Sequence, residues 1–191
     1  MCEAVRAHHI GSLLRPAPLR EAFRRHRAGA LTYGEYARAQ DEAIRAVVAM
    51  QEELGFRLVT DGEFRRASYW AHFVDAVDGL EVREALFEFT DEAGDRMAFT
   101  APHAAGRLSR GRPISAGELG FLQGVTSVTP KVTLPSPSTM HFWRGPAGRD
   151  PSVYPTVEDL YSDLATVYRE EIADLTRSGG RFMQIDEVAL A

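Results

Sequence analysis

Two acidic pairs follow apolar stretches that read as β-strands, and carboxylates in that position can do chemistry. The first pair is Asp61 and Glu63, with a glycine between them, and the second is Asp186 and Glu187. A carboxylate at a strand end can hold a substrate ammonium group or orient a nucleophile, and a glycine allows a ligand to approach closely. Asp-Gly is also a common turn pair, and strand ends often meet solvent. The pairs alone therefore leave a binding site and a solvated turn both open.

Several histidines could bind a metal, but they are scattered along the chain. They include His8, His9, His103 and His141, and Cys2 is the single cysteine. A zinc site needs three or four ligands from nitrogen, sulfur or carboxylate groups, and no tight ligand spacing joins these residues. We expect no zinc site built wholly from this chain, and no internal disulfide.

Three further residues have a plain structural interpretation. Trp143 follows a strand interrupted by prolines, where an aromatic side chain is more typical of the core than of a stacking platform. Arg65 and Arg66 could clamp an anionic group, but the pattern favours a solvated basic edge. The chain has no glycine-rich phosphate loop, no G-x-S-x-G elbow and no H-E-x-x-H pair, which weighs against nucleotide-binding, hydrolase and metalloprotease functions.

The bulk composition excludes other classes of partner. The chain has 191 residues, enough for one domain with a sizeable core. A net charge of −5 does not indicate the basic surface that binds nucleic acid. No apolar run approaches the roughly 18 residues of a membrane span, and the N-terminus lacks the apolar segment of a signal peptide. These features predict a cytoplasmic protein without nucleic-acid or membrane partners.

The elements that would position the acidic pairs alternate between strands and helices. The expected strands are 7–10, 56–64, two or more within 81–109, 130–134 and 181–187, and the expected helices are 19–29, 31–55, 115–127 and 156–180. Such alternation predicts an α/β fold with parallel strands joined by helical crossovers.

Both long helices carry start signals. Thr32 with Glu35 and Thr156 with Asp159 match the capping-box pattern, in which side chain and backbone at the helix start bond reciprocally. The apolar side chains expected on the buried faces are Ile44, Val47, Val48 and Leu54 in the first helix and Leu160, Leu164, Val167, Tyr168, Ile172 and Leu175 in the second.

Each predicted parallel strand is followed by a loop with polar groups, and in a (β/α)₈ barrel those loops share the face that holds the chemistry. A complete barrel takes about 250 residues, and only about half of its strands are found here. We therefore expect residues 1–191 to form the N-terminal half of a TIM barrel, as one incomplete domain with a β-hairpin-like insertion over about 81–110.

Four stretches, in order, carry a resemblance to one family. They are HHIGSLLRP, LVTDGEFRR, KVTLPSPSTMHFW and ADLTRSGGRFMQIDEVALA. Together they resemble the cobalamin-independent methionine synthase family in its C-terminal catalytic barrel, and more closely its short, single-barrel relatives. The resemblance covers about residues 7–191, and the last stretch is the most specific.

The resemblance implies a methyltransferase that uses zinc, and no cobalamin, to bind a thiol such as homocysteine as its thiolate. Zinc lowers the pKa of the thiol, which then attacks the methyl group of a methylfolate-like donor and gives methionine. By resemblance, Ile10, Gly11 and Ser12 would contact the amino-acid part of the thiol substrate. Glu63 and Asp186 would bind its ammonium group, which makes Asp186 the expected catalytic residue.

The resemblance also places Trp143 where the family stacks the pterin ring of folate. Val188 stands where the family usually has proline, and PSPST replaces a glycine-proline element of the third motif. The family's zinc ligands lie beyond the last matched stretch. We therefore expect this chain to be a fragment that is inactive alone. The alternatives are a non-catalytic half that binds a complementary C-terminal polypeptide, and an alkyltransferase acting on another thiol.

Overall fold

The computed structural model describes residues 7–86, 89–90, 96–97 and 99–188. Its elements, in chain order, are α1 (Ala17–Arg27), α2 (Tyr33–Glu53), β1 (Leu58–Val59), α3 (Ala71–Ala76), β2 (Val77–Glu84), β3 (Phe89–Thr90), β4 (Arg96–Met97), β5 (Thr100–Arg110), α4 (Ala116–Gln123), β6 (Thr129–Pro135), α5 (Thr139–Phe142), the 3₁₀ helix η1 (Gly145–Gly148), α6 (Val157–Arg177) and β7 (Phe182–Asp186). None of the described helices is long and apolar enough to cross a membrane.

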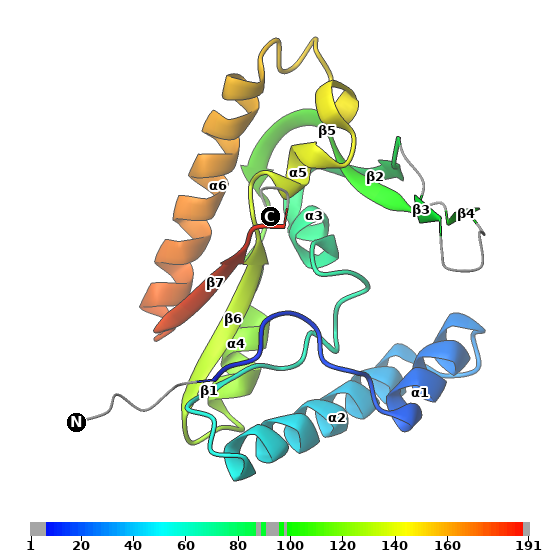
Figure 1. Ribbon diagram of the computed structural model, residues 1–191, viewed down its shortest axis with the longest axis vertical. Coiled ribbons are helices and arrows are strands. Elements are labelled where there is room, and N and C mark those ends of the chain that lie inside the picture. The colour runs from blue at the N-terminus through cyan, green and yellow to red at the C-terminus, as the bar shows by residue number, and fades with distance from the viewer. Residues whose placement is uncertain (1–6, 87–88, 91–95, 98, 189–191) are drawn as a thin grey trace.

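A three-stranded parallel sheet in the order β1-β6-β7 organises the molecule. The pairing of β6 with β7 runs from Lys131 opposite Phe182 to Pro135 opposite Asp186. The C-terminal ends of both strands point to the middle of the molecule, where the segment before α1 also passes (Figure 1). The predicted α/β class with a parallel sheet is confirmed, and the sheet brings the second acidic pair beside the end of β6.

Side chains of β6 alternate between two environments. Val132 and Leu134 are buried in the larger apolar cluster, together with side chains of α6 such as Leu164. Successive strand residues point to opposite faces, so Lys131 and Thr133 point the other way, although both are buried. The strand therefore presents a polar row toward the middle of the molecule.

The capping boxes of α2 and α6 are both formed. The side chain of Thr32 accepts from the Glu35 backbone, and that of Thr156 accepts from the Asp159 backbone. Most of the expected apolar residues are buried or partly buried, but Leu54 and Ile172 are exposed. Leu54 is the C-cap residue of α2, beyond the last turn that packs on the core, so the prediction for it was wrong.

The segment between α3 and α4 forms a long antiparallel hairpin of β2 and β5. The pairing shifts register between Asp78 and Leu80. Gly79 lies at this bulge with φ of +85°, and a Cβ there would lie 2.5 Å from the Arg107 carbonyl oxygen. Only glycine fits such a close approach. The expected strands of this region are present, and the DEAGD loop lies outside the described residues.

Two expected strands differ from the structure. Residues 7–10 form no strand, because their main chain is held by side-chain contacts rather than by a ladder. The strand expected over 56–64 is regular only at Leu58–Val59. Val59 pairs with Pro130, which has no N–H to extend the ladder, and the chain turns immediately afterwards.

Candidate functional site

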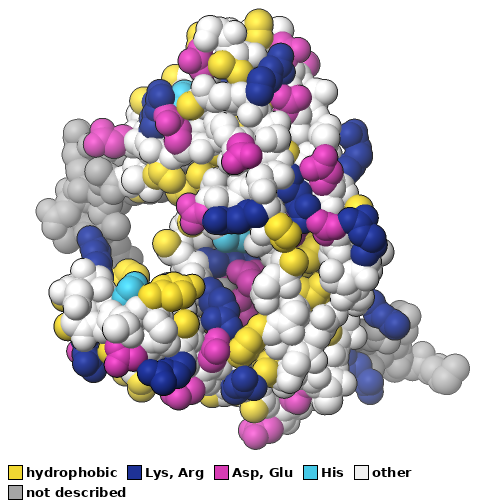
Figure 2. Space-filling model, turned by 180° about the vertical axis from the view of Figure 1, so that it is seen from behind, with side chains coloured by type: hydrophobic (Ala, Val, Ile, Leu, Met, Phe, Trp, Pro, Cys, Tyr) yellow, Lys and Arg dark blue, Asp and Glu magenta, His cyan; other side chains and the backbone are white. Residues whose placement is uncertain are grey.

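A cavity of about 520 Å³ opens at the C-terminal end of β7. Its lining residues are Ile10, Gly11, Ser12, Glu63, Tyr69, Gln184, Ile185, Asp186, Glu187 and Val188. Five of the six predicted site residues thus lie around one space, although they come from three distant parts of the sequence. In Figure 2 this part of the molecule is hollowed, and Lys or Arg and Asp or Glu side chains gather on the wall.

Glu63 is buried at the wall of the cavity, with both carboxylate oxygens engaged. Ser12 Oγ donates to Oε2 at 2.6 Å, and Thr133 Oγ1 donates to Oε1 at 3.1 Å. The guanidinium of Arg66 lies 3.6 Å from Oε1. These contacts fix the carboxylate from the N-terminal segment, from β6 and from its own loop.

The backbone of Glu63 is in the left-handed region, with φ of +59°. This conformation costs a residue with a side chain about 1–2 kcal/mol. Asp61 Oδ1 accepts from the Glu63 N–H at 2.9 Å, and the Leu13 N–H donates to the Gly62 carbonyl at 3.1 Å. Residues held in such unusual backbone conformations cluster at functional sites. Here the turn places the Glu63 carboxylate at the cavity.

Arg66 is buried, so the prediction of a solvated basic edge was wrong for it. It donates to both carboxylate oxygens of Glu118 and to Thr133. Burial disfavours its charge, but the surrounding carboxylates outweigh burial and raise its pKa. Arg65 is partly exposed and donates to Asp41 Oδ1 at 2.6 Å. The burial of Arg66 follows from its partners in the folded chain, Glu118 and Glu63, rather than from its neighbours in the sequence.

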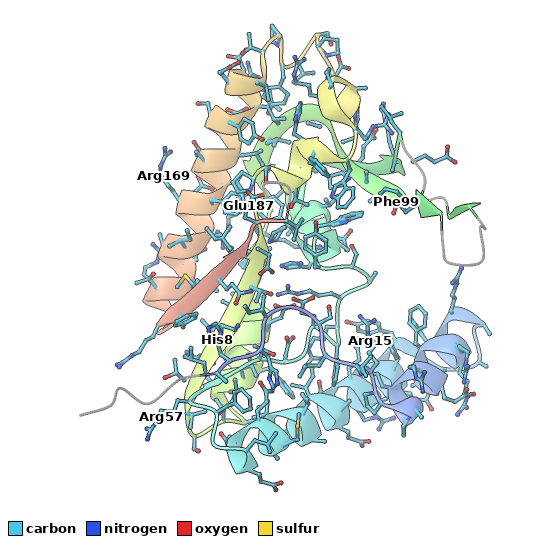
Figure 3. The ribbon with its side chains drawn as sticks, in the orientation of Figure 1. His8, Arg15, Arg57, Phe99, Arg169 and Glu187 are labelled. Carbon is cyan, nitrogen blue, oxygen red and sulfur yellow. The ribbon has the colours of Figure 1, made fainter. Side chains whose placement is uncertain are left out.

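Asp186 ends β7 at the other side of the cavity. Burial raises the pKa of its carboxyl, Glu63 raises it further, and a hydrogen bond from Gln184 opposes both effects. Gln184 Nε2 is the donor of that bond, to Asp186 Oδ1. The neighbouring Glu187 accepts from Ser138 Oγ at 2.8 Å and lies beside α5 (Figure 3).

Lys131 is a site residue that the sequence analysis did not identify. Its side chain is buried, and Nζ donates to Gln184 Oε1 at 2.7 Å and to the His9 carbonyl. The ring Nδ1 of His8 lies 3.3 Å from Nζ, and His8 approaches from the N-terminal segment (Figure 3). Burial lowers the pKa of Lys131, and the nearby Asp186 and Glu63 oppose this shift. The alternation of polar with apolar residues in β6 was the signal that could have found it.

Carboxylates outnumber cations in this region. Three carboxylate side chains, those of Glu63, Asp186 and Glu187, line the cavity, and none of its lining residues is basic. Carboxylates that line a cavity without a basic side chain favour a cationic ligand group. The arrangement can therefore bind an ammonium group between Glu63 and Asp186.

Trp143 is the predicted site residue that does not line the cavity. It follows α5 and packs edge-to-face with Phe99, at 5.4 Å between ring centroids, and with Phe142, at 5.2 Å. Phe99 belongs to the hairpin arm (Figure 3). A role for Trp143 in binding a methyl donor stays a prediction.

The residues around the cavity do not fit zinc. They offer carboxylate, hydroxyl and amide oxygens, whereas zinc sites in proteins are built chiefly from cysteine and histidine. Across the described part of the chain, no group of three or more His, Cys, Asp or Glu side chains could hold a metal ion. The donor set of the described cavity is thus one of oxygen atoms.

Comparisons with known proteins show the family of the chain. Residues 6–191 match the sequence model of the family described as "Cobalamin-independent synthase, Catalytic domain". The chain is 31% identical over 190 residues to the uncharacterized protein YxjH of Bacillus subtilis, covering 96% of this chain and 48% of that protein. It is 31% identical over 182 residues to a methionine synthase of Sulfolobus acidocaldarius, covering 95% and 51%.

A solved structure is similar as well. It is a B12-independent methionine synthase from Shewanella sp. W3-18-1 in complex with selenomethionine, with a TM-score of 0.67 and 25% identity, covering 84% of this chain and 45% of that one. The chain spans about half the length of these two curated relatives.

Proposed function

The chain belongs to the family of cobalamin-independent synthase catalytic domains, and from this premise we propose that its cavity binds the α-amino-acid part of a thiol or thioether such as homocysteine or methionine. The carboxylate excess around the cavity carries the proposal, because it suits a substrate ammonium group. Glu63 and Asp186 both line the cavity and would bind this group, and each accepts a side-chain hydrogen bond.

The rest of the cavity fits the remainder of such a ligand. Gly11, with φ of +76°, turns the N-terminal segment along the cavity rim. Backbone N–H groups at this turn would be the donors for a ligand carboxylate, because the Ser12 hydroxyl already donates to Glu63. Ile10, Ile185 and Val188 line the cavity and are exposed, so they offer an apolar surface to the methylene groups and the sulfur. The Shewanella relative, whose structure holds selenomethionine, supports this ligand class.

At the level of the whole enzyme, we propose transfer of a methyl group from a methylfolate-like donor to the sulfur of homocysteine, without cobalamin. The three parallel strands would be part of a (β/α)₈ barrel completed by residues outside this chain, which would also hold the zinc ion. In that arrangement Asp186 and Glu63 orient the substrate amine, and Trp143 would face the pterin of the donor.

Isothermal titration with L-homocysteine and L-methionine tests the proposal. We expect binding by the 191-residue chain, and about tenfold or greater weakening in Glu63→Gln, because charged hydrogen bonds contribute about 1.5–3 kcal/mol. Glu53→Gln, at an exposed position at the end of α2, is the matched control and should bind normally. Absence of binding by the wild type, or equal binding by Glu63→Gln, would refute the proposal.

A further inference from the structure

Lys131 is the only lysine of the chain, since 21 of its 22 basic residues are arginines. This one lysine is also among the most deeply buried side chains, with 1% of its surface exposed. Lysine is rarely buried unless it is paired. In a chain that otherwise uses arginine for positive charge, a buried lysine points to a place that needs a compact ammonium group rather than a planar guanidinium.

The ammonium of Lys131 is bound by neutral groups from two other segments. It donates to the His9 carbonyl in the N-terminal segment and to Gln184 Oε1 in β7, and His8 Nδ1 lies 3.3 Å away. Among the described residues no carboxylate lies within ion-pair distance of it. Burying a charge without a direct counter-ion is unfavourable, so packing alone does not account for this residue.

The bond to Gln184 fixes the orientation of the Gln184 amide. An ammonium group is a donor only, so it requires the amide oxygen to face Lys131. The amide nitrogen then faces Asp186, where Nε2 donates to Oδ1. Without the ammonium, the amide could turn its oxygen toward the carboxylate, and Asp186 would lose its donor.

The bond to His9 has a second effect on the cavity. His9 immediately precedes the rim residues Ile10, Gly11 and Ser12, and residues 7–10 have no strand partner. The contact with Lys131 joins His9 to β6, whereas the other contacts of His9 are to residues outside the parallel sheet: its Nδ1 lies 3.1 Å from Gln51 Oε1, and its ring stacks on Phe56.

We propose that Lys131 is a positioning residue of the cavity: through Gln184 it orients Asp186, and through His9 it helps to place the rim segment against the ligand. This inference rests on the proposed function, because it assigns to Lys131 the preparation of the site for an amino-acid ammonium group. Lys131 itself does not line the cavity.

The charged groups that bear on Asp186 come from three elements. Glu63 and Arg66 face it from the segment after β1, Lys131 from β6, and Glu187 is its neighbour in sequence. Glu63 raises the pKa of Asp186, whereas Arg66 and Lys131 lower it. Removal of Lys131 alone should thus shift the ionisation of Asp186 to higher pH.

The test compares Lys131→Met with the wild type by titration calorimetry with L-methionine at a series of pH values. Methionine keeps most of the apolar stem and removes the charge. We expect about tenfold weaker binding at neutral pH, from the loss of a charge-assisted contact, and a midpoint of the binding profile at higher pH. Arg57→Met, which removes an exposed positive charge beside β1, is the control and should keep the affinity and the pH midpoint of the wild type.

A measurement on the wild type keeps the proposal testable if the variant does not fold. With lysine labelled in ¹⁵N, the side chain gives a single signal, because the chain has one lysine. We expect this signal to move on addition of L-methionine and to follow the titration of Asp186. A lysine signal that shifts neither on addition of L-methionine nor with the titration of Asp186 would overturn this inference alone. So would a folded Lys131→Met variant that binds with the affinity and the midpoint of the wild type. Failure of the wild type to bind would overturn the proposed function with it.

Discussion

At the scale of single residues, the two acids of the cavity are held in different ways. Glu63 receives hydrogen bonds on both oxygens and lies near Arg66, so its position is fixed before a ligand arrives. Asp186 has a raised pKa because it is partly buried and faces Glu63. On the proposed function, a cationic ligand between them would relieve the repulsion, and we expect Asp186 to be the acid whose ionisation responds to binding.

The affinity for an amino-acid ligand should rise with pH. Asp186 must be ionised to bind an ammonium group, and its pKa is raised, so we expect its protonation at acidic pH to weaken binding. Asp186→Asn should bind about tenfold more weakly at neutral pH and lose most of this pH dependence. Calorimetry over a range of pH checks this, and a wild-type affinity that falls as pH rises through the acidic range would contradict it.

The same shift has a consequence for stability. Because the folded pKa of Asp186 lies above its unfolded value, its contribution to stability is greatest below the unfolded pKa and declines as pH rises through the folded pKa. We therefore expect Asp186→Asn to unfold at the same or a higher denaturant concentration than the wild type at neutral pH. A clear loss of stability would show that the carboxylate has a structural role.

At the scale of elements, Tyr154 joins the hairpin to α6. Its buried hydroxyl accepts from the Leu108 N–H of β5 at 2.7 Å and donates to Asp163 Oδ2 of α6 at 2.7 Å. Burial raises the pKa of Tyr154 to about 12, and the bond to Asp163 adds to this. The phenol therefore stays neutral and keeps both bonds over the physiological range.

Removal of this hydroxyl should destabilise the protein. Tyr154→Phe leaves the Leu108 N–H buried without its acceptor, which costs about 1–3 kcal/mol. Denaturant unfolding measures the change. Tyr33→Phe, at the exposed start of α2, is the control and should stay within about 0.5 kcal/mol of the wild type. Equal loss in both variants would contradict the assigned role.

Local signals made the long helices predictable, whereas the site needed tertiary information. The capping boxes at Thr32 and Thr156 act over three residues, so the sequence alone reveals them. The burial of Arg66 and Lys131 depends on the N-terminal segment and α4 covering them, which no neighbouring residue encodes. Residues 7–10 were predicted to form a strand from their composition, but a strand also requires a neighbouring strand to pair with, and the described residues provide none for them.

At the scale of the whole molecule, the described residues line a cavity whose side chains offer no zinc donor set. We expect the 191-residue chain to bind L-homocysteine yet to show no methyl transfer from a methylfolate donor. Metal analysis and a turnover assay check this together. Stoichiometric zinc with turnover by this chain alone would contradict it, whereas activity gained only on addition of a complementary polypeptide would agree with it.

Of the two acids in the cavity, Glu63 is synthesised well before Asp186. Glu63 belongs to a turn closed by local contacts, whereas Asp186 reaches the cavity only when β7 docks along β6. Chains are made from the N-terminus and their parts fold as they emerge. A nascent chain that extends only through α6 can already hold Glu63 in its turn. If the proposed function holds, such a chain would not bind an amino acid, and ligand binding would distinguish chains with a docked last strand from shorter intermediates.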